Sequence, residues 1–155
     1  MIRPATPADT PELLAMTAAT GVFRPMEVDT LKEVLDDYHA EAADAGHRCF
    51  VLEEHGEHLG FVYHAAEAMT EGTWILWWIV VKPHTQGKGV GGRLMQFAEH
   101  DAKKLGARLV YLYTSGLPHS ELTRKFYLKH GYEQEGRLRD FYAAGDDQIV
   151  FRKVL

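Results

Sequence analysis

Four glycines lie within six positions of the segment VKPHTQGKGVGGRLM, directly before a stretch with a helical pattern. They are Gly87, Gly89, Gly91 and Gly92, and Lys88 stands among them. The first turn of a helix leaves its backbone N–H groups without partners inside the helix, and the helix dipole places positive charge there. Glycines let further N–H groups turn inward and let a bulky anion approach the main chain. The spacing therefore predicts a turn that holds a phosphate compound, with Lys88 adding charge.

This turn differs from the two common nucleotide-binding motifs. The P-loop pattern GxxxxGK[ST] is not matched, because Lys88 lies between glycines and no Ser or Thr follows it. Gly87, Gly89 and Gly92 fit GxGxxG, but the preceding strand lies in mid-chain and no clear ribose-binding acidic residue follows the next strand. The segment instead matches Gln/Arg-x-x-Gly-x-Gly/Ala, with Gln86, Gly89 and Gly91 at the defined positions.

A strand and a helix must position the glycine turn. The run Thr73–Val81 is almost wholly apolar, so we expect a central strand buried on both faces. After the turn, an apolar stripe runs along a predicted helix over residues 90–105, which Gly106 ends. The other predicted elements are a strand over 2–6, helices over 9–19 and 26–45, strands over 48–53, 59–66 and 108–114, a helix over 121–130, and two strands within 132–155 joined at AAGDD. The order β-α-α-β-β-β-α-β-α-β-β indicates an α/β fold with a mixed sheet.

Length and composition limit the classes of protein. The chain has 155 residues, 46% of them hydrophobic, which fits one globular domain over residues 1–155. No apolar run reaches the roughly 18 residues of a membrane span, and the N-terminus lacks the pattern of a secretory signal. The net charge of −5 argues against general nucleic-acid binding. Cys49 is the single cysteine, which favours a reducing cytoplasm, and the nine scattered histidines form no HExxH or Cys/His quartet, so we expect no metal site.

Several segments together resemble the GNAT family of N-acetyltransferases. They are IRPATPAD, the hairpin that contains LGFVY, IVVKPHTQGKGVGGRLM, and ELTRKFYLKHGYEQEG. The glycine string alone is a weak signal, but the succession of strand, motif, helix, strand and FYLKHGY is specific and covers nearly the whole chain. The resemblance implies the acyl-CoA N-acyltransferase fold, with a mixed, mostly antiparallel central sheet flanked by helices.

The resemblance also implies acetyl-CoA as the acyl donor. In this family the glycine turn cradles the pyrophosphate of coenzyme A, and the pantetheine arm lies along the preceding strand. By resemblance, the backbone of Ile79, Val80 and Val81 pairs with that arm. The residues expected at the phosphates are Gln86, Gly87, Lys88, Gly89, Val90, Gly91 and Gly92.

Acetyl transfer to an amine needs few protein groups, because the thioester is already activated. The amine must lose a proton, the carbonyl must be polarised and the leaving thiolate must be protonated. The resemblance assigns the last step to Tyr127 of the Phe-Tyr pair, although packing beside Phe126 is the other interpretation. Seven residues earlier the family often has an asparagine that contacts the cofactor, whereas this chain has Ser120, which has a shorter reach, and Thr123 stands where alanine is usual.

The sequence does not identify which group acts as the general base. Many relatives carry a glutamate on the strand before the glycine turn, but TWILWWIVV has no ionisable side chain. Candidates near it are Glu71, His84, Tyr113 and His119, and His84 has a suitable unperturbed pKa of about 6.5. A chain of water molecules that serves several polar groups is an equal alternative, and a backbone carbonyl could orient the amine.

The acceptor is expected between the first two helices and the late hairpin. A pocket of carboxylates and aromatic rings suits an amine cation, although each single residue could equally serve the core or a solvated face. The aromatic candidates are Phe23, Trp77, Trp78, Tyr111, Tyr113, Phe141 and Tyr142, and the acidic candidates are Glu27, Asp140, Asp146 and Asp147.

These observations predict an N-acetyltransferase that moves an acetyl group from acetyl-CoA to a primary amine by direct attack in a ternary complex. The amine could belong to a small molecule, a protein N-terminus or a lysine. The alternative is a catalytically silent acyl-CoA-binding sensor or regulatory module, which Ser120 and the missing carboxylate favour and Tyr127 disfavours. We expect no membrane or nucleic-acid partner, and the last strand, QIVFRKVL, could pair across a two-fold axis in a homodimer.

Overall fold

The strands of the protein form one mixed sheet. The structure, a computed structural model, describes residues 1–85 and 87–155. The strands are β1 (Ile2–Pro4), β2 (Arg48–Glu54), β3 (Glu57–Ala66), β4 (Thr73–Val81), β5 (Leu109–Ser115), β6 (Glu133–Ala143) and β7 (Asp146–Val154). They lie in the order β1-β2-β3-β4-β5-β7-β6, and each neighbouring pair is antiparallel except β4 and β5. The predicted element order and the mixed, mostly antiparallel sheet are confirmed.

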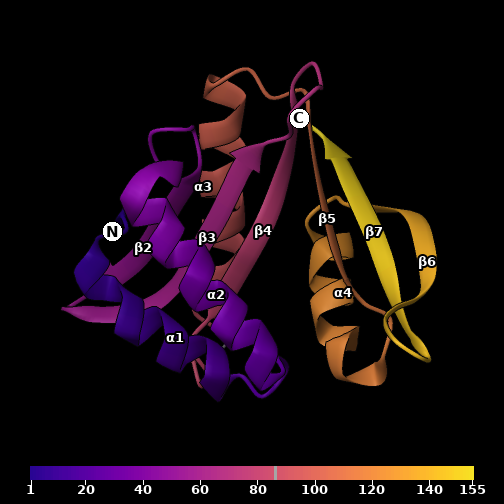
Figure 1. Cartoon of the computed structure of the whole chain (residues 1–155), viewed down its shortest axis with the longest axis horizontal. Helices are drawn as coiled ribbons and strands as arrows, with labels where there is room; N and C mark the ends of the chain where they lie inside the picture. The colour runs from indigo at the N-terminus through magenta and orange to yellow at the C-terminus, as the bar shows by residue number, and fades with distance from the viewer. Residues whose placement is uncertain (86) are drawn as a thin grey trace.

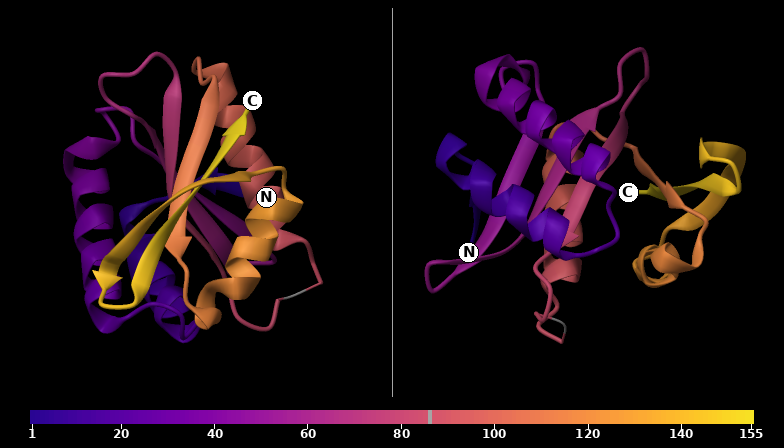
Figure 2. Two further views of the ribbon diagram at one scale, coloured as in Figure 1. Left: turned by 90° about the vertical axis from the view of Figure 1, so that its right-hand side faces the viewer. Right: turned by 60° about the horizontal axis from the view of Figure 1, so that its bottom comes forward.

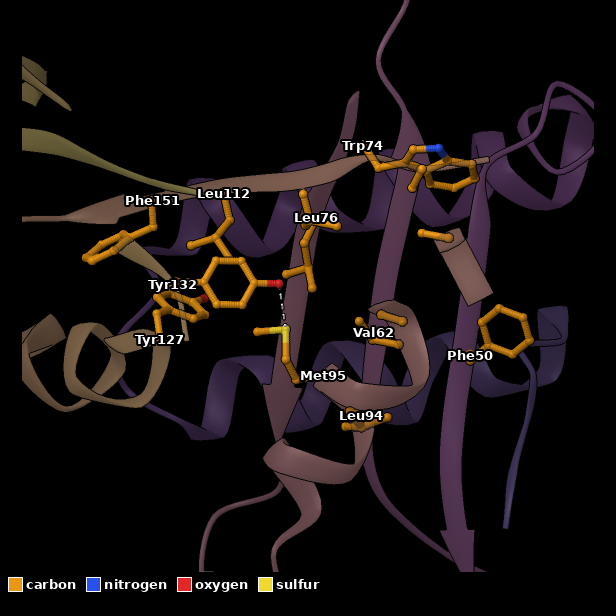
Figure 3. Packing of buried hydrophobic residues seen from close by; sticks show 14 of the residues in the cluster. Phe50, Val62, Trp74, Leu76, Leu94, Met95, Leu112, Tyr127, Tyr132 and Phe151 are labelled. Atoms are coloured by element: carbon orange, nitrogen blue, oxygen red, sulfur yellow. Dashed lines mark hydrogen bonds between the residues drawn. The ribbon is translucent and has the colours of Figure 1, made fainter. Parts of the chain in front are cut away.

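Helices cover both faces of the sheet (Figures 1 and 2). They are α1 (Thr10–Ala19), α2 (Pro25–Asp37), α3 (Val90–Lys104) and α4 (Glu121–Lys129), with 3₁₀ turns at Pro7–Asp9 and Pro118–Ser120. The helices α1 and α2 lie on one face, and α3 lies on the other. Tyr127 of α4 shares a buried core with the residues of α3 (Figure 3). Within the described part of the chain, no helix combines the length and the apolar character needed to cross a membrane.

Gly60 on β3 lets α3 lie close to the sheet. A Cβ atom at this position would stand 2.7 Å from the Val80 carbonyl oxygen and 2.8 Å from Cδ1 of Leu94. Backbone atoms cannot yield at such distances, so only glycine permits this approach. The contact fixes the beginning of α3 beside the end of β4, where the glycine turn joins the two elements.

The strands β4 and β5 separate after a short parallel contact. They pair only over Thr73–Ile75 of β4 and Leu109–Tyr111 of β5. Beyond these residues the ribbons diverge (Figure 1). The second half of β4 therefore keeps a partner strand, β3, on one side alone.

A β-bulge at Trp77 divides β4 into two halves. Tyr63 of β3 faces Trp78, and His64 faces Leu76, which leaves Trp77 as the extra residue. Before the bulge, Leu76 belongs to the core under α3; after it, Trp78 packs against the core under α1 and α2. The side chain of Trp77 is 42% exposed. The expectation that the whole strand is buried on both faces is therefore wrong for its second half, where β5 no longer pairs with β4 and Trp78, Ile79 and Val81 are only partly buried.

The second helix ends earlier than its apolar pattern predicts. The α-helix α2 stops at Asp37, and a π-turn follows over Tyr38–Ala42, closed by a 3.1 Å hydrogen bond from the Ala43 N–H to the Tyr38 carbonyl. Tyr38 is buried and packs edge-on against Tyr63, with ring centroids 5.7 Å apart. The wider turn keeps this side chain on the sheet while the chain bends towards β2.

The last strand is an inner strand of the sheet. β7 pairs with β5 on one side and with β6 on the other, so the edges of the sheet are β1 and β6. The expected pairing of QIVFRKVL across a two-fold axis is therefore wrong, since neither edge of β7 is free.

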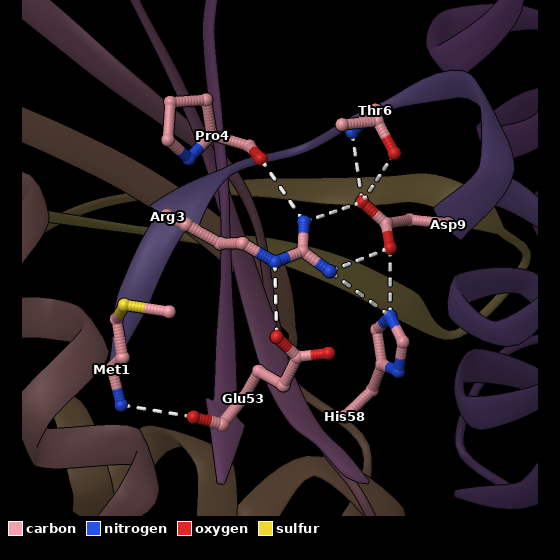
Figure 4. A network of polar contacts seen from close by, with 7 residues as sticks. All are labelled: Met1, Arg3, Pro4, Thr6, Asp9, Glu53 and His58. Carbon is pink, nitrogen blue, oxygen red and sulfur yellow. Dashed lines mark hydrogen bonds and ion pairs between the residues drawn. The ribbon is translucent and has the colours of Figure 1, made fainter. Parts of the chain in front are cut away.

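Asp9 joins the beginning of the chain to the β2–β3 hairpin (Figure 4). It is 4% exposed and accepts hydrogen bonds from the Arg3 guanidinium at 2.8 and 2.9 Å and from the Thr6 N–H at 2.8 Å. His58 Nε2 lies 2.7 Å from Asp9 Oδ1. The Arg3 hydrogen bonds hold the pKa of the Asp9 carboxyl well below its usual range, although burial acts in the opposite direction.

Replacement of Asp9 by asparagine is expected to lower the free energy of unfolding at pH 7 by roughly 1–3 kcal/mol, the size of hydrogen bonds to charged groups. Because the folded-state pKa is depressed, this stability is present above the ordinary carboxyl pKa of about 4 and is lost as pH falls below it. Urea unfolding between pH 7 and pH 2 should therefore show the difference between the two proteins shrinking in acid. Asp36→Asn, which removes an exposed ion pair to Lys32, is the control and should cost at most about 1 kcal/mol.

Candidate active site

The edge of β4 that faces the gap carries unpaired backbone groups. The Lys82 N–H donates to the Leu59 carbonyl at 2.8 Å. Since hydrogen-bonded pairs alternate along an antiparallel ladder, Val80 also exchanges hydrogen bonds with β3 through Phe61, its partner in the register. Ile79 and Val81 stand on either side of Val80, at positions that form no hydrogen bonds with β3, and direct their N–H and C=O groups towards the gap. Of the strand residues predicted to contact the donor, Ile79 and Val81 thus offer backbone partners, while Val80 is committed to β3.

The glycine turn opens directly onto the first turn of α3. Gly87 and Gly89 have φ angles of 86° and 66°, and a Cβ at either position would meet nothing within 4 Å. Gly89 is the N-cap residue of α3 and has no side chain that could cap the helix. The first N–H groups of the helix, beginning at Val90, therefore have no intrahelical acceptor and no cap from the N-cap residue. Gln86, which was expected at the phosphates, lies outside the described residues.

The other two glycines make room for α4. A Cβ at Gly91 would stand 3.1 Å from the ring of Phe126, and one at Gly92 would stand 3.0 Å from the ring of His130. The four glycines thus divide into two pairs with different physical roles. The first pair shapes the turn, and the second lets α4 pack onto the first turn of α3.

Contacts of Ser120 and Arg124 fix the position of the beginning of α4. Ser120 is buried as the N-cap residue of α4. Arg124 donates from Nη1 to the carbonyl oxygens of Ser115 at 2.7 Å and Leu117 at 2.8 Å. These bonds tie α4 to the end of β5, on the far side of the gap from β4. Nothing in the sequence points to this role of Arg124, because an arginine beside Lys125 has the pattern of an exposed helix face.

Tyr127 projects from α4 into the core beside the gap. Its ring packs against Phe126 at 5.7 Å, Tyr132 at 6.1 Å and Phe151 at 5.7 Å between centroids (Figure 3). Burial raises the pKa of its phenol, and the nearby Tyr142 hydroxyl raises it further. The phenol is therefore protonated at neutral pH and can act as a proton donor.

No hydrogen bond joins the Tyr127 hydroxyl to another residue that the structure describes, whereas the hydroxyl of its neighbour Tyr132 donates to Glu99 at 2.9 Å. Both interpretations of Tyr127 are compatible with this geometry, since the ring packs in the core and the hydroxyl is available.

Aromatic side chains gather where the late hairpin faces the beginning of α2. Phe23 packs on Trp78 at 5.4 Å, and Phe141 packs on Tyr113 at 6.3 Å and on Tyr142 at 4.9 Å. Burial, together with the charges of Tyr113, Glu27 and Asp146, raises the pKa of Tyr142. The hairpin of β6 and β7 thus lies within electrostatic reach of α2. Tyr111 is not part of this group, because its hydroxyl donates to Glu67 at 2.6 Å.

The acidic candidates of this region already have partners within the protein. Glu27 forms an ion pair with Arg24 at 2.9 Å, and Asp147 forms one with Arg137 at 2.7 Å. The Asp140 carboxylate accepts from the Gly145 N–H at 2.8 Å, and Asp146 accepts from the Ser115 hydroxyl. Asp140, Asp146 and Asp147 therefore organise the hairpin.

The candidates for the general base are widely separated. Glu71 precedes β4 and lies at the end of that strand opposite the glycine turn. His84 and His119 are exposed, in the turn after β4 and in the 3₁₀ turn before α4. Tyr113 lies beside Phe141 in the aromatic group. Among the described residues, no group of three or more His, Cys, Asp or Glu side chains could hold a metal ion.

The chain is similar to known proteins in sequence and in fold. Residues 45–134 match the family model described as Acetyltransferase (GNAT) domain. A crystal structure of a protein from Desulfovibrio desulfuricans, assigned to the GNAT family of acetyltransferases, is 34% identical with a TM-score of 0.92, and the match covers 99% of this chain and 98% of that one.

Two further relatives differ in what they share with the chain. The uncharacterized N-acetyltransferase YhfO of Bacillus subtilis is 34% identical over 88 residues, which are 55% of this chain and 58% of that protein. The match thus spans less than two thirds of YhfO. PaiA N-acetyltransferase of Thermoplasma acidophilum, solved in complex with coenzyme A, is 19% identical with a TM-score of 0.77 over 100% of this chain and 98% of that one, a likeness of fold.

Proposed function

The chain belongs to the GNAT family of N-acetyltransferases, and from this premise we propose that it transfers the acetyl group of acetyl-CoA to a primary amine. The observation that carries the proposal is the gap between β4 and β5. Along it, Ile79 and Val81 direct backbone groups away from β3, and the beginning of α3, where Gly89 supplies no capping side chain, follows. Acetyl-CoA matches both features, because its pantetheine arm is an extended chain of amides and its other end carries phosphates.

In this proposal, the pantetheine amides pair with the backbone of Ile79 and Val81, and Val80 supports that edge through its pairing with β3. The diphosphate is held by N–H groups of the turn and of the first helical turn, with Lys88 as a nearby cation. Ser120 is assigned to the donor side of α4. The residues proposed at the phosphates are Gln86, Gly87, Lys88, Gly89, Val90, Gly91 and Gly92.

The reaction proceeds by direct attack of the amine on the thioester. The neutral amine nitrogen forms a bond to the carbonyl carbon, the C–S bond breaks, and the products are an amide and the coenzyme A thiol. Tyr127 donates its phenolic proton to the departing sulfur. The proton lost by the amine passes to solvent, directly or through Tyr113, and the balance is completed when solvent returns a proton to Tyr127.

Isothermal titration calorimetry tests the donor half of this proposal. We expect both coenzyme A and acetyl-CoA to bind with dissociation constants between about 1 μM and 1 mM, the usual range for enzyme substrates. Pantetheine, which lacks the diphosphate, is the control and should bind at least about tenfold more weakly, because it cannot use the helix N-terminus. The absence of heat with either coenzyme A form, on folded protein, would overturn the proposal.

A thiol-release assay with a panel of amines tests the acceptor half. Acetyl-CoA should yield free thiol faster in the presence of a suitable primary amine than in buffer alone, and mass spectrometry should detect the matching amide. Binding of acetyl-CoA without thiol release on any amine of the panel would contradict the transferase activity while leaving the binding site intact.

A further inference from the structure

A hollow lies beside the π-turn, on the face of the sheet that carries α1 and α2. Its volume is about 440 Å³, and the residues that matter for its chemistry are Asp37, Glu41, His47, Tyr63 and Trp77. We call it the distal hollow, because β4 leads from it through Trp78 to the backbone of Ile79. π-turns and β-bulges are both frequent beside functional sites, and here the two irregularities flank the same hollow.

Aromatic rings form the floor of the distal hollow. Trp77 stacks on Tyr63 with centroids 5.3 Å apart and an interplanar angle of 12°. His47 meets the Trp77 ring edge-on at 5.1 Å and 88°, and its Nδ1 lies 2.6 Å from the Tyr63 hydroxyl. The indole is thus held rigidly while 42% of its residue surface stays exposed. An indole that is held by two neighbours and keeps this much exposed surface is available for contact with a ligand in the hollow.

Two carboxylates line the distal hollow above this floor. Asp37 is the last residue of α2, and Glu41 lies one helical turn later, within the π-turn. Within the described part of the chain, neither carboxylate forms an ion pair, whereas Glu27 and Asp147 near the gap are each paired with an arginine. Both residues are exposed, so a cation that enters the hollow from solvent can pair with them.

The aromatic rings and the two carboxylates of the distal hollow together favour an organic cation as the ligand. A Trp face attracts ammonium groups more strongly than other aromatic rings do, and nearby carboxylates add charge complementarity. An anion would be repelled by Asp37 and Glu41, and a purely apolar ligand would leave both carboxylates without a partner. A small metal ion is disfavoured because the described residues hold no group of three ligands.

The distal hollow and the proposed transfer site lie close together along β4. Trp77 and Ile79 are two residues apart on β4, a separation of about 7 Å along a strand. Trp77 lines the hollow and Trp78 packs against the core under α1 and α2, so both side chains lie on the same face of the sheet. An extended aliphatic chain with an amine at each end spans this distance.

We propose that the distal hollow binds the far ammonium group of an elongated di- or polyammonium acceptor, whose near amine receives the acetyl group. The proposal rests on the proposed function for the acetyl step, and the binding of the cation to the hollow is independent of it. The far ammonium lies against the Trp77 face and pairs with Asp37 and Glu41. The acceptor is therefore selected by a second positive charge as well as by its nucleophilic amine.

The first experiment measures binding without chemistry. Tryptophan fluorescence of the protein is titrated with 1,6-diaminohexane and with 1-hexanol, a neutral chain of similar length. We expect saturable quenching by the diamine alone, and a half-saturation concentration about tenfold higher in Asp37→Asn/Glu41→Gln. Asp44→Asn, which removes a nearby carboxylate outside the hollow, should titrate like the natural protein. Equal quenching by the alcohol, or an unchanged titration in the double variant, would overturn the proposal.

The second experiment measures selectivity in acetyl transfer. The natural protein should use 1,6-diaminohexane with a kcat/KM at least about tenfold above that of hexylamine. Most of this difference should lie in KM, because the far ammonium is bound equally well in the ground state and in the transition state. In Asp37→Asn/Glu41→Gln this ratio should fall to about 1, the value without recognition of the second charge. If neither amine is acetylated while the diamine still quenches fluorescence, the transferase activity fails and the cation site stands. Turnover with equal kcat/KM for the two amines would contradict the proposal that the distal hollow binds the acceptor.

Discussion

Replacement of Tyr127 by phenylalanine is expected to lower kcat for acetyl transfer by about 100-fold or more, the usual contribution of a positioned general acid. The thiolate of coenzyme A leaves more easily when a proton reaches it, and the burial that raises the pKa of Tyr127 keeps that proton on the phenol at neutral pH. Phenylalanine fills the same place beside Tyr132 and Phe151, so the core should be kept. Steady-state thiol release gives kcat, and calorimetry should give a dissociation constant for acetyl-CoA within about threefold of the natural value, because a proton donor acts in the chemical step.

Tyr132→Phe provides a matched control for this experiment. Tyr132 is a buried neighbour in the same core, but its hydroxyl already donates to Glu99 at 2.9 Å and approaches the Met95 sulfur at 3.3 Å (Figure 3). Its loss should cost about 1–2 kcal/mol of stability and leave kcat unchanged. If Tyr127→Phe keeps the natural kcat while Tyr142→Phe loses it, the proton comes from the hairpin and the role assigned to Tyr127 is wrong.

Replacement of Gly89 by valine is expected to weaken acetyl-CoA binding by roughly 10- to 100-fold, which matches a backbone strain of about 1–3 kcal/mol. Gly89 has a φ of 66°, a conformation that a β-branched residue strongly disfavours. Since a Cβ there would meet nothing within 4 Å of the protein, the effect comes from the backbone and from the ligand side. The turn must relax, and the N–H groups at the beginning of α3 then lose their common direction. Calorimetry with coenzyme A measures the loss.

Gly56→Val separates this effect from a general loss of stability. Gly56 lies in the turn between β2 and β3 with a φ of 76°, and a Cβ there would likewise meet nothing within 4 Å. Both variants carry similar strain and should lose similar unfolding free energy, but only Gly89→Val should lose affinity. Equal dissociation constants for these two variants would contradict the assignment of the phosphates to the beginning of α3.

The sequence was sufficient for the order of elements, for the bounds of β4 and, to within one residue at its end, for those of α3. Both have strong local signals, since an unbroken apolar run and a long amphipathic stripe are separated by glycines. The bounds of β4, Thr73–Val81, agree with the prediction residue for residue. Local periodicity also located α4, to within one residue at its end.

The irregularities of the fold could not be predicted from local periodicity. The bulge at Trp77 depends on the register between β4 and β3, which is a contact between strands. The π-turn at Tyr38 depends on the packing of this residue against Tyr63.

The structural roles of several charged and small residues could not be predicted from the sequence either. Asp140 and Asp147 were predicted near the acceptor, yet their oxygens hold the hairpin through Gly145 and Arg137. Gly91 was predicted to contact the phosphates. The structure shows a second reason for glycine at this position, because a Cβ atom would stand close to the ring of Phe126. Such partners lie far away in sequence, and composition does not reveal them.

The extra residue in β4 has a consequence for how the chain can change over time. Removing Trp77 alone would leave Leu76 opposite His64 and Trp78 opposite Tyr63, on the faces that they now occupy, so the strand would become regular without a change of register. A deletion well away from the bulge would instead exchange the two faces for the positions on one side of it. Loss of one residue should therefore be tolerated better at Trp77 than elsewhere in β4, and a library of single deletions along the strand would reveal the difference.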